Sequence, residues 1–188
     1  MREKIDIYLI RHTKPLIEPG TCYGQTDCSV ADDYSAKLLN IINYFEEIKI
    51  DAIYSSPLKR CAVLAEDLAK TQLNHPVIYD DRFKEINFGN WEGQKWDDIA
   101  REDIDNWNEN RLSFRFPGGE SPEIFHDRVL QASFDGLGIG KEKIAYKSIV
   151  LVAHSGVICS LLCRHLKLPL ENMTELSVDY ASISKITI

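Results

Sequence analysis

Residues 5–15 read Ile-Asp-Ile-Tyr-Leu-Ile-Arg-His-Thr-Lys-Pro, an apolar run that ends at a basic residue and an imidazole. The β-branched side chains and short length of this run predict a buried strand that ends at Ile10. Pro15 cannot donate to a strand ladder, so a loop is expected around it. Arg11 and His12 are therefore expected where a buried strand gives way to a loop.

A second stretch with the same organisation lies near the other end of the chain. Residues 148–153 read Ser-Ile-Val-Leu-Val-Ala and are followed at once by His154. A strand this apolar is typical of a sheet covered on both faces. The chain has five histidines, and two of them, His12 and His154, directly follow such a strand. The two strand ends are therefore the first candidates for a functional site.

The rest of the chain alternates strands with helices. Further strands are predicted over 52–54, 76–79 and part of 181–188, and helices over 33–48, 56–71, 122–136 and 157–166. Ser56 as N-cap and Pro57 at the first helical position place Arg60 in the first turn of a helix. The alternation predicts an α/β fold, a three-layer α/β/α sandwich with a mainly parallel mixed sheet. Residues 80–122 are expected to form a small cap insertion in a single domain of residues 1–188.

The composition excludes several classes of protein. The 188 residues carry 22 Lys and Arg against 29 Asp and Glu, a net charge of −7, which disfavours binding to nucleic acid or to an anionic membrane. No run reaches the ~20 apolar residues of a membrane span, and the N-terminus does not read as a secretion signal. Five cysteines, an odd number, fit reduced thiols in a cytoplasmic protein. Cys159 and Cys163 are expected in the core rather than as metal ligands.

The predicted strand ends bring together groups that suit an anion. Each histidine alone has a plainer explanation, as a loop or core side chain that bonds to backbone. Together, Arg11, His12, Arg60 and His154 would repel one another unless an anion binds between them. A phosphoryl group matches them, since each charge-assisted hydrogen bond contributes about 1.5–3 kcal/mol. The amides of residues 155–156, at the start of a helix, would add donors.

Phosphoryl transfer also requires an attacking atom and a proton for the leaving oxygen. Neutral imidazole is nucleophilic near pH 7, so His12 can supply the attacking nitrogen. The proton must come from a carboxyl group that stays protonated beside an anionic substrate, whose charge raises the pKa of that carboxyl. The chain has 29 acidic residues, and this chemistry alone does not select one of them.

The sequence resembles the histidine phosphatase superfamily in five motifs that follow the family's order and span nearly the whole chain. They are Leu-Ile-Arg-His-Thr (9–13), Ser-Ser-Pro-Leu-Lys-Arg (55–60), Glu-Ile-Asn-Phe-Gly-Asn-Trp-Glu-Gly (85–93), Pro-Gly-Gly-Glu-Ser (117–121) and Val-Ala-His-Ser-Gly-Val-Ile (152–158). The resemblance implies that His12 is the nucleophile that becomes phosphorylated and that Glu85 is the general acid. It also implies that Arg11, Arg60 and His154 hold the phosphate, and that water hydrolyses the phosphohistidine without metal or cofactor.

Within the superfamily, the opening motif and Cys-Tyr-Gly-Gln-Thr-Asp (22–27) are similar to the α-ribazole phosphatase branch. This similarity implies a phosphomonoesterase that acts on a small molecule, α-ribazole 5′-phosphate, in cobamide synthesis. Gly24, Gln25 and Thr26 would then border the phosphate, together with Ser155.

The chain departs from the family pattern beside two motifs. Thr13 and Lys14 stand where a Gly and a Glu are usual, and Ser155 stands in place of a common Gly. None of these changes removes a reacting group. They therefore bear on rate and specificity more than on the type of reaction.

Four other functions remain open. Phosphoglycerate mutase-type transfer would use the same nucleophile, and a broad-specificity small-molecule phosphatase would use the same site. A metal-dependent hydrolase would use His12, His154 and Glu85 as ligands, although two nearby arginines disfavour a bound cation. A module that binds a phosphorylated ligand without turnover is the fourth alternative, because Thr13 and Lys14 depart from the family pattern directly after His12. The oligomeric state is not indicated by the sequence.

The cap region adds two further expectations. Five aromatic residues are expected to form its core, with stacking on an aromatic leaving group as the alternative role. The five are Trp91, Trp96, Trp107, Phe114 and Phe116. Glu120 and Ser121 precede a proline and are expected to cap the next helix.

Overall fold

The computed structural model describes residues 4–72, 76–139 and 146–188 of the chain. Its strands form a mixed sheet in the order β3-β2-β4-β1-β5, in which β5 is antiparallel to β1 and the other pairings are parallel. The strands are β1 (Asp6–Arg11), β2 (Ala52–Ser55), β3 (Ile78–Tyr79), β4 (Ser148–Ala153) and β5 (Ile183–Thr187). The prediction of an α/β fold with a mainly parallel mixed sheet is confirmed.

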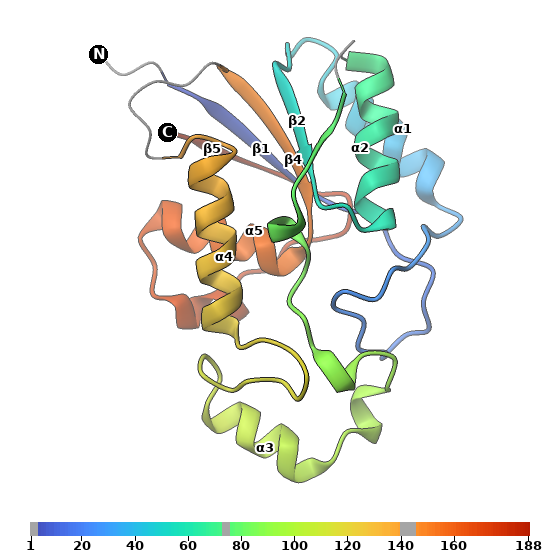
Figure 1. Ribbon diagram of the computed structural model, residues 1–188. Helices are drawn as coiled ribbons and strands as arrows, with labels where there is room; N and C mark the ends of the chain where they lie inside the picture. The colour runs from blue at the N-terminus through green and yellow to red at the C-terminus, as the bar shows by residue number, and fades with distance from the viewer. Residues whose placement is uncertain (1–3, 73–75, 140–145) are drawn as a thin grey trace.

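Helices cover both faces of the sheet and complete the three layers seen in Figure 1. On one face lie α1 (Tyr34–Tyr44) and α2 (Lys59–Gln72), and on the other α4 (Pro122–Asp135) and α5 (Ser155–Leu166). Side chains alternate along β1, because successive residues of a strand point to opposite faces. Tyr8 and Ile10 pack into the core beneath α1 and α2, whereas Ile7 and Leu9 pack into the other core.

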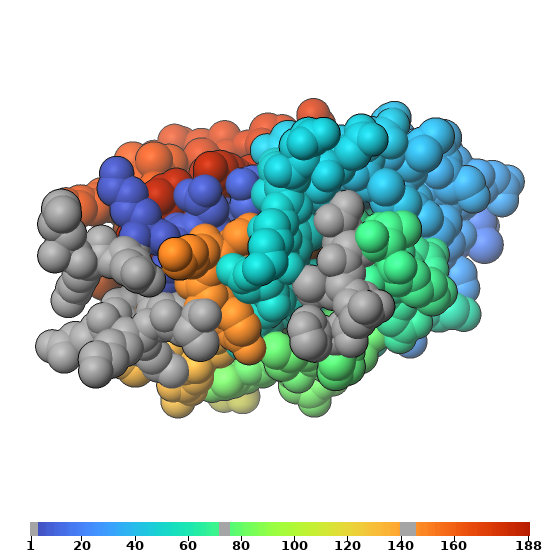
Figure 2. Space-filling model, turned by 90° about the horizontal axis from the view of Figure 1, so that it is seen from above, coloured from blue at the N-terminus to red at the C-terminus, as the bar shows by residue number. Residues whose placement is uncertain are grey.

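The register of the parallel strands brings three predicted site segments to one edge of the sheet. Beyond β1, the His12 N–H donates to the Ala153 carbonyl over 3.0 Å. Beyond β2, the Ser56 N–H donates to the Val152 carbonyl over 3.0 Å. Figure 2 views the molecule from the opposite end, where the starts of β1, β4 and β2 lie side by side. His12, Ser56 and His154 therefore leave the sheet at the same edge.

Most of the 80–122 segment lies beyond this edge, with α3 (Arg101–Glu109) at the bottom of Figure 1, whereas its first 3₁₀ helix lies beside α4 in the middle of the view. It contains short 3₁₀ helices at Asp81–Phe83, Gly89–Trp91 and Trp96–Asp98, and α3 (Arg101–Glu109). Trp91 and Phe116 are buried with ring centroids 5.0 Å apart. Trp96 stacks on Trp107 at 5.9 Å. The expectation that these aromatic residues form a packed core is confirmed.

α2 begins later than its sequence signal predicts. The helix starts at Lys59, although the Ser56 hydroxyl still accepts the Leu58 N–H over 3.3 Å. The first helical hydrogen bonds run to the Leu58 carbonyl, so residues 56–58 form a turn that leads into the helix. Arg60 keeps its expected place in the first turn.

Smaller differences occur at other element ends. The helix predicted over 33–48 stops at Tyr44, because the chain continues in single turns, and the helix predicted from residue 157 already begins at Ser155. A 3₁₀ helix at Leu170–Thr174 follows α5. Within the described ranges, no helix combines the length and apolar character required to cross a bilayer.

Candidate active site

His12 is buried directly after β1, and its ring is held in one orientation. The Nδ1–H donates to the Thr13 carbonyl over 2.7 Å, an assignment of the tautomer that leaves a lone pair on Nε2. The Arg60 Nε–H donates to this Nε2 over 3.3 Å. Burial, followed by the charges of Arg60 and Arg11, lowers the pKa of His12 to about 3. The imidazole is therefore neutral at pH 7, the form that can attack phosphorus.

Arg60 is fully buried in the first turn of α2 and is held by a loop far away in sequence. Its Nη1 donates to the Thr26 carbonyl over 2.8 Å, and its Nη2 donates to the Gly24 carbonyl over 2.7 Å. A buried guanidinium needs such acceptors, because an uncompensated charge in the interior is very costly. The loop therefore fixes Arg60 against the His12 ring.

His154 directly follows β4 and occupies the N-cap position of α5. Its ring centroid lies 5.1 Å from that of His12, and its Nε2 lies 2.8 Å from the Ser56 hydroxyl oxygen. Burial first, then the charges of His12 and Arg60, lowers the pKa of His154 well below its ordinary value. The sequence predicted Ser56 only as a helix cap, since nothing local connects it with a histidine 98 residues away.

Arg11 is the second arginine of the site, in addition to Arg60. Its side chain stacks on Tyr180, a residue that carries no signal in the sequence. Its guanidinium carbon lies 3.8 Å from the ring centroid of Tyr180, and its Nη1 donates to the Val178 carbonyl. The hydroxyl of Tyr180 is 2.8 Å from that of Tyr23. The buried Arg11 Nε has no hydrogen-bond partner among the described residues, so a donor remains available for an anion.

A cavity of about 150 Å³ lies at this edge of the sheet. It is lined by Arg11, His12, Thr21, Cys22, Tyr23, Gly24, Glu85, Phe88 and Trp96. Two further predicted site residues, Arg60 and His154, are fully buried against the imidazole and do not line the cavity. Gln25, Thr26 and Ser155 do not line it either. The structure thus joins a neutral imidazole, an arginine and a carboxyl group around one cavity.

Glu85 also lines this cavity, and its carboxyl group is held at both oxygens. Oε2 accepts the Gly156 N–H and Oε1 accepts the Ile86 N–H, each over 3.1 Å. A Cβ at position 156 would lie 2.4 Å from Glu85 Oε1, so the contact requires glycine there. Burial raises the pKa of Glu85, although these two hydrogen bonds oppose the shift. The Gly156 amide, expected as a phosphate donor, is engaged by Glu85.

Glu92 organises the loop that holds Arg60. Its carboxylate accepts the Gln25 N–H over 2.8 Å and the Thr26 N–H over 2.6 Å. Gln25 Nε2 also donates to the Glu85 carbonyl over 3.0 Å. Phosphate binding by Gln25 and Thr26 stays a prediction, because their amides are used within the protein. Glu92 lies within the 85–93 motif, but its place in the sequence carries no signal for this role in holding the loop.

Known proteins resemble this chain over almost its full length. The family model for the histidine phosphatase superfamily (branch 1) matches residues 7–188. The chain belongs to the histidine phosphatase superfamily. Some relatives are named phosphatases and others probable phosphoglycerate mutases. The family membership, together with the phosphatase-named relatives, identifies this chain as a phosphatase.

This histidine phosphatase has relatives whose substrates differ. It is 28% identical over 186 residues to Phosphoserine phosphatase 1 of Hydrogenobacter thermophilus, covering 97% of this chain and 86% of that protein. It is 27% identical over 187 residues to the Adenosylcobalamin/alpha-ribazole phosphatase of Escherichia coli strain K12, covering 97% of this chain and 89% of that protein. Among solved structures, a mycobacterial glucosyl-3-phosphoglycerate phosphatase superposes with a TM-score of 0.78 at 26% identity, covering 98% of this chain and 90% of that one.

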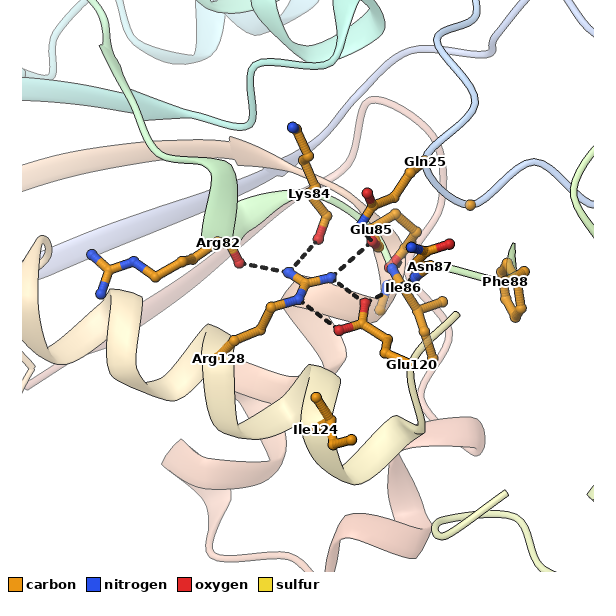
Figure 3. Close-up of polar contacts among 12 residues, drawn as sticks. Gln25, Arg82, Lys84, Glu85, Ile86, Asn87, Phe88, Glu120, Ile124 and Arg128 are labelled. Carbon is orange, nitrogen blue, oxygen red and sulfur yellow. Dashed lines mark hydrogen bonds and ion pairs between the residues drawn. The ribbon is translucent and has the colours of Figure 1, made fainter. Parts of the chain in front are cut away.

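Polar contacts around α4 of the histidine phosphatase correct one expectation. Ser121 caps the helix as predicted, since its hydroxyl accepts the Ile124 N–H over 3.4 Å. Glu120 does not cap the helix. Its carboxylate pairs instead with Arg128, as Figure 3 shows, because two guanidinium N–H groups match a carboxylate better than one backbone amide does.

The cysteines of the histidine phosphatase are core residues. All five are free and buried, so the expectation that Cys159 and Cys163 pack in the core is confirmed. In the described part of the chain, no three His, Cys, Asp or Glu side chains converge as a metal ion would need.

Proposed function

We propose that this phosphatase hydrolyses phosphomonoesters of small molecules without a metal, through a phosphohistidine formed at Nε2 of His12. One observation carries the proposal. The His12 ring is neutral, its Nδ1–H is fixed by a carbonyl, and it shares a cavity with a carboxyl group whose pKa is raised. The imidazole thus has the neutral form that the first step needs, and burial shifts the pKa of the carboxyl group in the direction that a general acid needs.

In the first step, the phosphate dianion enters the cavity at Arg11 and His12 and is expected to reach Arg60 and His154, which lie behind the imidazole in this structure. The Arg60 Nε–H, which donates to His12 Nε2 in this structure, would turn to a phosphoryl oxygen and release the nitrogen lone pair. Nε2 then attacks phosphorus while the bond to the leaving oxygen breaks. Glu85 gives its proton to that oxygen, so the leaving group departs as a neutral alcohol.

In the second step, water hydrolyses the phosphohistidine. The Glu85 carboxylate accepts a proton from the water as its oxygen attacks phosphorus. The P–N bond breaks, and its electron pair returns to Nε2 of His12. Inorganic phosphate leaves, and both side chains regain their starting protonation states.

We propose α-ribazole 5′-phosphate as the substrate. The 22–27 loop motif supports this proposal, and so does the similarity to the Escherichia coli relative with that name. Phe88 and Trp96 also line the cavity and offer aromatic surface to the base of such a leaving group. Phosphoserine is the second candidate, because of the similarity to the phosphoserine phosphatase of Hydrogenobacter thermophilus.

The test measures phosphate release from four substrates after dialysis against EDTA. They are p-nitrophenyl phosphate, α-ribazole 5′-phosphate, phosphoserine and 3-phosphoglycerate. We expect turnover of the first without metal, inhibition by vanadate, and the highest kcat/KM for α-ribazole 5′-phosphate. Loss of activity on chelation would overturn the metal-independent mechanism. Isomerisation of phosphoglycerate faster than phosphate release would indicate a mutase instead, and a higher kcat/KM for phosphoserine would replace the substrate.

A further inference from the structure

Arg128, on the second turn of α4, binds the main chain of the segment that carries Glu85. Its Nη1 donates to the Arg82 carbonyl over 2.7 Å and to the Lys84 carbonyl over 2.8 Å. Its Nη2 donates to the carbonyl of Glu85 itself over 2.9 Å. Figure 3 shows the guanidinium surrounded by these three carbonyl oxygens. One side chain thus supplies hydrogen bonds to three peptide groups beside the general acid.

Glu120 holds the other side of the same guanidinium. Its carboxylate accepts from Arg128 Nε over 2.9 Å and from Nη2 over 2.5 Å. One of its oxygens also accepts the Asn87 N–H over 2.9 Å. The Arg128–Glu120 pair therefore contacts the chain both before and after Glu85. The two side chains are 20% and 13% exposed, so water competes less for this pair than for a surface ion pair.

This segment needs such support because no regular element provides it. The chain leaves the 3₁₀ helix Asp81–Phe83 and forms no strand before the next 3₁₀ helix at Gly89–Trp91. Its carbonyls therefore lack a ladder partner, and buried carbonyls without partners are costly. Arg128 meets that need with a planar group whose several N–H donors point in fixed directions.

We propose that Arg128 is the positioning residue for Glu85: it holds the main chain so that the carboxyl proton points at the leaving oxygen. This proposal rests on the proposed function, in which Glu85 is the acid. A shift of about 1 Å in a catalytic group can cost ~10²-fold in rate. In kcat/KM, which reports the step in which the leaving group departs, the loss would fall on protonation of the leaving oxygen, since none of these contacts of Arg128 involves His12 or Arg60.

The test compares leaving groups, because a merely structural residue would not respond to them. kcat/KM is measured for phosphomonoesters that range from p-nitrophenyl phosphate to glycerol phosphate, in the wild type, Arg128→Lys, Glu120→Gln and Glu85→Gln. Lysine keeps the charge of Arg128 but cannot reproduce its planar fork. Arg101→Lys is the matched control, since Arg101 pairs with Asp105 within α3.

For Arg128→Lys we expect a roughly tenfold or larger loss with glycerol phosphate and less than a threefold loss with p-nitrophenyl phosphate, whose leaving group needs little protonation. Glu120→Gln should show the same trend more weakly, and Arg101→Lys should match the wild type. Equal losses on all substrates in Arg128→Lys would overturn the positioning role. If Arg128→Lys does not fold, the same series on Glu120→Gln decides.

Glu85→Gln separates this proposal from the one it rests on. A leaving-group trend in Glu85→Gln but not in Arg128→Lys would overturn the positioning role and leave Glu85 as the acid. The absence of a trend in both variants would overturn both assignments. A trend in both, steeper in Glu85→Gln, is the result that we expect.

Discussion

The two sides of the candidate active site are built in different ways. The side that holds the proposed nucleophile, called the nucleophile side below, follows directly from the sheet. His12 and His154 directly follow β1 and β4, and the His12 N–H extends the hydrogen-bond ladder to Ala153. On the acid side, Glu85 lies in an irregular segment held by side chains from elsewhere, chiefly Arg128, 43 residues away in sequence.

This difference separates two kinds of functional loss. In the proposed mechanism, the groups around His12 bind phosphate or attack it, so they act on every phosphomonoester alike. In the same mechanism, the groups around Glu85 affect kcat/KM through the proton given to the leaving oxygen, so their importance for kcat/KM depends on how much protonation that oxygen needs. Substitutions on the two sides should therefore leave distinct patterns across a substrate series.

The largest effect is expected for His12→Asn. Without the attacking nitrogen, kcat should fall by at least about 10⁴-fold on every substrate. Phosphate release and capture of an acid-labile phosphoryl adduct from labelled substrate provide the two measurements. A similar adduct on another residue of the variant would contradict the assignment of the nucleophile.

Arg60→Ala should cost roughly 10²–10³-fold in kcat, the usual loss for one donor to a transition state. The factor should be the same for p-nitrophenyl and alkyl substrates, because Arg60 lies on the nucleophile side. Circular dichroism provides the control, since Arg60 is fully buried and its loss also lowers stability. A loss that grows with the basicity of the leaving group would contradict the assignment of Arg60 to the nucleophile side.

Glu85→Gln should give the opposite pattern. Its kcat/KM should fall about 10²-fold with glycerol phosphate and change little with p-nitrophenyl phosphate. The pH profile sharpens this test. Because burial raises the pKa of Glu85, wild-type kcat/KM for alkyl substrates should fall as pH rises through that raised pKa. The alkaline fall should vanish in the variant. Its persistence would show that another group supplies the proton.

His12 and Glu85 should also make contributions to the free energy of unfolding that change with pH in opposite directions. Burial lowers the pKa of His12 from 6.5 to about 3, so its contribution to the free energy of unfolding is present above 6.5 and is lost as pH falls. The loss is about 1.4 kcal/mol per pH unit. Glu85, with its raised pKa, contributes stability at low pH that is lost as pH rises. Urea unfolding between pH 7 and pH 5 should show a shallower fall in His12→Asn than in the wild type.

The smallest effect is expected for Trp96→Ala. Trp96 lines the cavity and stacks on Trp107, so its loss removes apolar surface for an aromatic leaving group. KM should rise about two- to tenfold for aromatic phosphomonoesters, in line with the ~0.5–1.5 kcal/mol of an aromatic pair. KM for glycerol phosphate should stay unchanged. An equal rise for both substrates would indicate a collapsed cap core.

The nucleophile side could largely be predicted from the chain. A strand that ends at Ile10 and one over 148–153 are periodic, apolar signals, and parallel strands present their carboxyl ends at one edge. The chemistry of imidazole and guanidinium then pointed to His12 and Arg60. Glu85 was reached only by resemblance, because none of the 29 acidic residues carries a local signal for an acid.

What the sequence by itself determined is therefore the α/β fold, the sheet edge and the type of groups that meet there. Tertiary structure alone decided which distant groups meet. It placed Ser56 against His154 and paired Glu120 with Arg128. It also directed the N–H groups of Gln25 and Thr26 to the Glu92 carboxylate. The physical reason is the range of the interactions. Strands and helices arise from periodic patterns among neighbours, whereas hydrogen bonds between distant side chains and main chain exist only after the core has packed and brought the partners together.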